Sequence, residues 1–182
     1  MDRKTVLLVV LLSGAMLGLL AVPAFSRQSG VKPIGWHFRT EFVAHLSGRT
    51  WVSIVNSSVT YTIDTRAEGQ AIFHTDEGMT EIKFMLIASN IENIIMAHIH
   101  IDTGVELGPI VVWLYPRMPP QQEIPGRFNG VLAKGRITDA DLVGPLQGMT
   151  IANLVAKMRS GEAYVVVHTT QHPPGEIRGF IH

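Results

Sequence analysis

Short segments in which apolar and polar positions alternate follow one another along most of the chain. They are rich in Val, Ile, Thr and Phe, and Gly, Pro, Asn and Asp separate them. This alternation predicts half-buried β-strands, and so many short strands are typical of a β-sandwich or barrel. We therefore expect an all-β fold, a single antiparallel β-sandwich or barrel. The expected strands are 36–45, 50–55, 59–65, 70–75, 80–88, 95–101, 110–115, 128–137, 163–169 and 176–182, with breaks at 67–69, 76–78 and 117–126.

One segment near the end of the chain has a helical period instead. Thr150 is suited to the N-cap of a helix and Gly161 to the position just after its end. The segment predicts one short amphipathic helix of about three turns in a late crossover connection, with a further short turn at 139–142. Its apolar residues at i, i+3, i+4 and i+7 are Ile151, Leu154, Val155 and Met158.

The first 26 residues have the features of a secretory signal peptide. Arg3 and Lys4 form a short cationic region, residues 6–22 form an apolar stretch, and a small-x-small sequence ends at Ser26. This order predicts a signal peptide over 1–26 with cleavage after Ser26. We expect a protein that is secreted, periplasmic or held at the cell surface.

An uncleaved anchor is the alternative, because the apolar segment 5–25 is long enough to cross a bilayer. In that case the N-terminal segment alone would contact the membrane. We expect residues 27–37, which are polar and contain Gly and Pro, to form a flexible lead-in. The β domain would then span residues 38–182.

Composition limits the chemistry open to this chain. It has no cysteine, eight histidines, and 15 basic and 15 acidic residues. A balanced charge argues against nucleic-acid binding, and the lack of thiols excludes Cys-based metal sites and nucleophiles. No glycine-rich nucleotide motif is present either, so we expect no nucleotide or organic cofactor. Nitrogen and oxygen ligands would have to hold any metal ion.

The sharpest local feature is a His-x-His pair in the expected strand 95–101. Side chains alternate between the two faces of a strand, so His98 and His100 share one face with Met96 and Asp102. The two imidazoles would lie roughly 7 Å apart along the strand. The other face would carry the apolar residues Ala97, Ile99 and Ile101 toward the core.

A third histidine, His168, lies on the expected strand 163–169 and would complete a metal site. His182, His172 and Asp102 are possible fourth ligands. Three imidazoles with no thiolate suit zinc or copper. The alternative is that these histidines are structural and hydrogen-bonded within the protein.

Glu176 and Arg178 form a second polar motif in the last expected strand, where they share one face. Arg178 could anchor a buried carboxylate or bind an anion. It could also hold a loop or a sheet edge in place, which is the more frequent role of such an arginine.

Several motifs in one order resemble the CHRD domain, the module named after chordin. They are Leu46-Ser47-Gly48, Ala97-His98-Ile99-His100, Gly108-Pro109-Ile110-Val111-Val112, Gly135-Arg136-Ile137-Thr138, the run SGEAYVVVHT at 160–169 and GEIRG at 175–179. The resemblance covers about 42–182. It implies a β-sandwich or barrel of immunoglobulin-like or superoxide-dismutase-like character, an extracellular module and no established enzymatic activity. The family motifs include His98, His100, His168, Glu176 and Arg178.

Three functions follow from these observations. The first is an exported CHRD-like binding module with a His-rich copper or zinc site. The second is an extracellular adhesion or protein-binding scaffold whose histidines are structural. The third is a copper-dependent redox enzyme resembling superoxide dismutase. The expected partners are a metal ion or an extracellular protein. The sequence favours a protein without catalytic activity over an enzyme.

Overall fold

Seven strands, one α-helix and two 3₁₀ turns make up the part of the chain described by the computed structural model, residues 41–49, 62–104 and 107–182. The predicted signal peptide, the lead-in 27–37, the expected strand 50–55 and the beginnings of the expected strands 36–45 and 59–65 lie outside the described residues. The expected strand 59–65 is wrong in its described part, since residues 62–65 belong to no strand. The elements are β1 (Glu41–Ser47), β2 (Glu68–Thr75), β3 (Ile82–Ile101), β4 (Ile110–Tyr115), β5 (Ile124–Ile137), η1 (Asp139–Asp141), η2 (Gly144–Leu146), α1 (Ile151–Arg159), β6 (Ala163–Thr169) and β7 (Ile177–Phe180).

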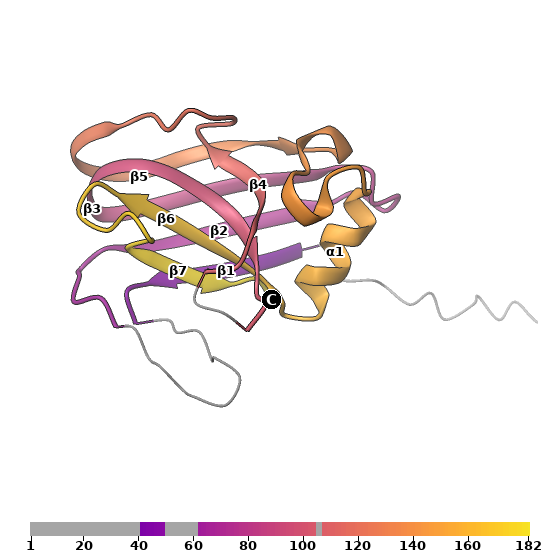
Figure 1. Cartoon of the computed structure of the whole chain (residues 1–182), viewed down its shortest axis with the longest axis horizontal. Coiled ribbons are helices and arrows are strands. Elements are labelled where there is room, and N and C mark those ends of the chain that lie inside the picture. The colour runs from indigo at the N-terminus through magenta and orange to yellow at the C-terminus, as the bar shows by residue number, and fades with distance from the viewer. Residues whose placement is uncertain (1–40, 50–61, 105–106) are drawn as a thin grey trace, which may run out of the picture. The chain divides into compact units, whose positions relative to one another are not determined.

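The strands close into a barrel. Their order is β2-β1-β7-β6-β3, and a further antiparallel pairing of β3 with β2 completes a ring of five strands. Two more strands, β4 and β5, pair with β3 outside this ring. In Figure 1 the yellow strands β6 and β7 lie between β3 and the indigo strand β1. The predicted all-β fold with one short helix is confirmed, and the sheet is closed.

The long strand β3 corrects the expectation of two strands at 80–88 and 95–101. It runs without a break through the polar stretch between them and changes neighbours on the way, from β2 to β6. Asn90 and Asn93 adopt left-handed backbone conformations, with φ of 52° and 53°. Asn tolerates this conformation better than most residues, so the chain bends and shifts register against β5 here without leaving the sheet.

Other boundaries agree with the sequence in part. Strands β4 and β6 have the predicted limits, whereas β5 begins at Ile124, before the expected start. The predicted break at 67–69 is wrong, since β2 already begins at Glu68. Gly69 pairs with Leu46 on β1 and with Ala88 on β3, and a Cβ at this position would lie only 2.8 Å from the Ile87 carbonyl oxygen. A glycine can therefore mark a close approach between strands as well as a turn.

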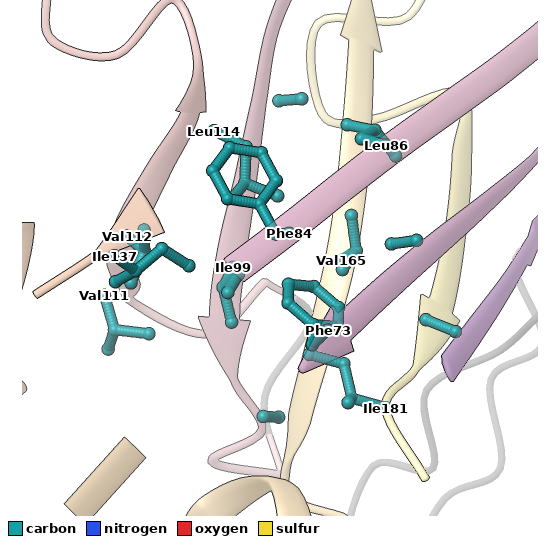
Figure 2. Close-up of a cluster of buried hydrophobic side chains, with 14 of the residues drawn as sticks. Phe73, Phe84, Leu86, Ile99, Val111, Val112, Leu114, Ile137, Val165 and Ile181 are labelled. Carbon is teal, nitrogen blue, oxygen red and sulfur yellow. The ribbon is translucent and has the colours of Figure 1, made fainter. Parts of the chain in front are cut away.

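The barrel interior and the helix share one hydrophobic core. Figure 2 shows side chains from several strands gathered together, among them Phe73, Ile99 and Val165. The helix α1 begins as predicted after Thr150, which forms a reciprocal capping box with Asn153. Its buried face consists of the predicted residues Ile151, Leu154, Val155 and Met158. Among the described residues, no helix has the length and apolar character needed to cross a membrane.

Candidate metal centre

Alternation along the second half of β3 directs two histidines away from the core. Ala97 and Ile99 belong to the hydrophobic core cluster. Because successive side chains of a strand point to opposite faces, His98 and His100 extend from the other face. Both histidines are nonetheless buried, with 0% and 1% of their surface exposed. This outer face of the sheet is therefore covered, in part by the chain around Gly108, which contacts His100.

Antiparallel pairing of β6 with β3 brings the third histidine to the same face. His168 lies directly opposite Met96, and Val166 lies opposite His98. The Nε2 atom of His168 is 3.2 Å from the Nδ1 atom of His98. One ligand atom from each of His98, His100 and His168, hereafter the His triad, lies within 4.8 Å of the others. The structure thus joins the three residues that the sequence singled out, in an arrangement that could hold a metal ion.

Backbone carbonyls orient two of the three imidazoles. The Nδ1 of His100 donates a hydrogen bond to the Gly108 oxygen at 2.7 Å, and the Nδ1 of His168 donates one to the Pro173 oxygen at 2.8 Å. A carbonyl oxygen only accepts, so each Nδ1 must carry the proton and each neutral ring has its lone pair on Nε2. This outer hydrogen bond is the one that metal-binding histidines usually make.

The remaining nitrogens fit a cation. The Nε2 atoms of His98 and His100 are buried and have no hydrogen-bond partner in the protein. A buried polar atom without a partner is costly, and a bound metal would satisfy the lone pair.

Burial keeps the three imidazoles neutral. The pKa of His98 is lowered from 6.5 to about 3, chiefly by burial and to a smaller extent by electrostatic repulsion from His168 and His100. Burial likewise lowers the pKa of His100 and of His168 to about 4, with the positive charge of Arg178 acting in the same direction on both. The carbonyl hydrogen bonds oppose these two shifts without reversing them. Neutral imidazole is the form that binds metals.

Tyr164 and Gly108 hold His100 in place. The Tyr164 ring stacks on His100 with ring centres 5.4 Å apart, and its hydroxyl accepts a hydrogen bond of 2.9 Å from the Gly108 N–H. A Cβ at Gly108 would lie only 1.7 Å from the Ile101 carbonyl oxygen, so only glycine fits there. The sequence did not predict these supporting roles. The one indication in the sequence was that Tyr164 lies on the same face of its strand as His168.

A tryptophan also borders the site. Trp113 on β4 lies opposite His98 in the sheet, and the two rings meet edge to face with centres 4.2 Å apart. Sequence reasoning missed this contact because register shifts in the pairing of β4 with β3 decide which β4 side chain lies beside His98.

The three possible fourth ligands lie outside the His triad in the described part of the chain. An Asp102 oxygen accepts a hydrogen bond from the Gly104 N–H at 2.8 Å. His172 lies in the loop after β6 and lines a cavity there. His182 is exposed, and its backbone pairs with Val43 of β1.

Glu176 and Arg178 have different surroundings. The buried Glu176 carboxylate accepts hydrogen bonds from the hydroxyls of Thr65, at 2.7 Å, and Thr169, at 2.8 Å. It therefore ties the segment before β2 to the end of β6. Arg178 lies on β7 opposite Val166, on the same face as the His triad, and lines the cavity beside His172.

The order of motifs along this barrel agrees with a family model. The model of the CHRD domain matches residues 42–181. The chain belongs to the CHRD-domain family. The match includes the whole His triad together with Glu176 and Arg178, and it confirms the resemblance seen in the sequence. Comparisons with curated proteins and with solved structures found no match.

Proposed function

We propose that this CHRD domain is an exported binding module that holds a copper or zinc ion on its His triad. The observation that carries the proposal is the pair of buried, unpartnered Nε2 atoms of His98 and His100. The neutral donor set, all nitrogen and free of thiolate, suits these two metals. Export follows from the signal peptide predicted at 1–26, and a module outside the cell could combine metal binding with a protein partner.

The alternative of purely structural histidines explains less. Hydrogen bonds to the carbonyls of Gly108 and Pro173 account for one nitrogen of His100 and one of His168. They leave the Nε2 of His100 buried without a partner. A hydrogen bond donated by the Nδ1 of His98 to the Nε2 of His168 would satisfy these two nitrogens. It would still leave the Nε2 of His98 buried without a partner. A metal ion satisfies what internal hydrogen bonds do not.

Metal titration of the purified protein tests the proposal. Calorimetry with Zn²⁺ and with Cu²⁺, after treatment with a chelator, should give one tight site per chain in the unmodified protein. Substitution of both His98 and His100 by alanine should abolish that site, since a single imidazole remains. His45→Ala with His74→Ala is the matched control, because these two exposed histidines lie on β1 and β2, away from the His triad.

Two results would contradict the proposal. One is an affinity for both metals that the His98→Ala, His100→Ala double variant does not change. The other is the absence of a saturable site in the unmodified protein. A superoxide dismutation assay of the copper-loaded protein separates the binding module from the redox enzyme, because only the enzyme would show activity above that of the double variant.

A further inference from the structure

A cavity of about 300 Å³ lies beside the loop that follows β6. Its apolar walls come from Ile63, Leu107 and Pro174, which belong to three separate segments of the chain. Gln171 and His172 add hydrogen-bonding groups. The volume is at the lower end of the range for small-molecule sites, and apolar walls with a few polar groups are typical of such sites.

Arg178 supplies the charge of this cavity. It is the one lining residue with a permanent charge, and no carboxylate lines the cavity, among the residues that the structure describes. A guanidinium has five N–H donors, so Arg178 can contact its own protein and a ligand at the same time. Arg178 therefore places a guanidinium group at the wall of the cavity, where it can pair with an anion.

The position of Arg178 follows from strand pairing. Val166 lies between His98 on β3 and Arg178 on β7, opposite each of them, so the three residues form a row across the sheet. Gly175, another lining residue, packs directly above Val166: a Cβ there would lie 2.3 Å from the Val166 Cγ1. The close approach of this loop to the sheet puts the cavity beside the His triad and separate from it.

We propose that this cavity binds a small organic carboxylate, whose charged group pairs with Arg178 and whose apolar body packs against Ile63, Leu107 and Pro174. A planar carboxylate can form two parallel hydrogen bonds with a guanidinium. A single arginine beside three apolar walls suits an acid with a hydrocarbon portion better than inorganic phosphate. The site requires no metal on the His triad, so it can be tested independently of the proposed function.

The test compares acids with their uncharged amides on the unmodified, metal-free protein. Butyrate and benzoate should bind in calorimetry or in NMR titration, with shifts at residues that line the cavity. Butyramide and benzamide have nearly the same shape without the charge, and they should bind about ten- to a hundredfold more weakly, the usual cost of losing a charge-assisted hydrogen bond. This comparison needs no substitution and holds even where a variant fails to fold.

Substitution of Arg178 then locates the anion. Arg178→Gln should weaken butyrate and benzoate binding by about ten- to a hundredfold and leave amide binding unchanged, while Arg178→Lys should retain part of the affinity. Arg127→Gln is the control, because Arg127 lies on β5 and pairs with Glu92 on the surface. Equal binding of acid and amide, no saturable binding of either acid, or inorganic phosphate bound as tightly as benzoate would overturn the proposal.

Discussion

The Nδ1 atom of His98 lies 3.2 Å from the Nε2 atom of His168, although 70 residues separate the two along the chain. Pairing of β6 with β3 creates this contact, and the bonds from His100 to Gly108 and from His168 to Pro173 orient the other imidazoles. The proposed metal site therefore depends on sheet register and on two loops. Each of these dependences can be tested.

Tyr164→Phe tests the support of His100. The variant retains the ring that stacks on His100 and removes the hydroxyl that accepts from the Gly108 N–H. An unsatisfied buried N–H should lower the free energy of unfolding by about 1–3 kcal/mol. Displacement of the Gly108 carbonyl should weaken metal binding about 10- to 100-fold. Urea unfolding and metal titration measure the two effects.

Tyr115→Phe is the matched control for this experiment. Tyr115 lies at the end of β4 and is half-buried, and no hydrogen bond joins its hydroxyl to Gly108 in the described structure. We expect its variant to bind metal like the unmodified protein. If both variants changed metal affinity to the same extent, the role assigned to the Tyr164 hydroxyl would be wrong.

Trp113 should report copper binding. Its ring centre lies 4.2 Å from that of His98. Cu²⁺ bound by His98 would therefore lie near the indole and quench its fluorescence, whereas the closed-shell Zn²⁺ would not. The chain has three tryptophans, so a Trp113→Phe variant should lose most of the copper-dependent quenching and still bind copper in calorimetry. Undiminished quenching in that variant would place the copper elsewhere.

Acid should destabilise the metal-free protein in a defined pH range. The folded-state pKa values of the His triad, about 3 to 4, lie below the unfolded value of about 6.5. The unfolded chain therefore binds more protons below pH 6.5, and the free energy of unfolding should decrease as the pH falls from about 6.5 toward 4. Above pH 7.5 both states hold neutral imidazoles, so this contribution should be constant.

Urea unfolding at intervals between pH 7.5 and 5 measures this dependence before most carboxylates titrate. His168→Gln retains a buried polar side chain without an ionisable group, so its curve should be flatter than that of the unmodified protein. Identical slopes for the two proteins in this pH range would show that His168 does not contribute.

Arg178→Gln should strengthen metal binding, opposite to its expected effect on carboxylate binding. The Arg178 charge acts on His100 and His168 in the same sense as a nearby cation, so its removal lowers the repulsion of a divalent ion. We expect a gain of about three- to thirtyfold in Zn²⁺ affinity, which corresponds to about 0.7–2 kcal/mol of repulsion removed. Arg178→Lys should stay close to the unmodified protein, and a loss of Zn²⁺ affinity in Arg178→Gln would contradict the electrostatic argument.

Much of the local structure could be predicted from the sequence. The limits of β4 and β6, the apolar face of α1 and its N-cap at Thr150 all follow from side-chain periodicity and capping chemistry, which act between residues close in the chain. The same period of two places His98 and His100 on one face of β3. These features do not depend on which strands become neighbours.

Tertiary structure decided what local patterns leave open. Asn90 and Asn93 continue β3 through a polar stretch because neighbouring strands supply backbone partners on both sides of the bend. The supporting roles of Gly108 and Tyr164 depend on a loop folding back onto the sheet, and the edge contact of Trp113 depends on the register of β4. Sequence by itself determined which histidines share a face, because the pleat of a strand is local. Only the closed barrel decided that His168 completes their group, because contacts across 70 residues depend on the pairing of distant strands.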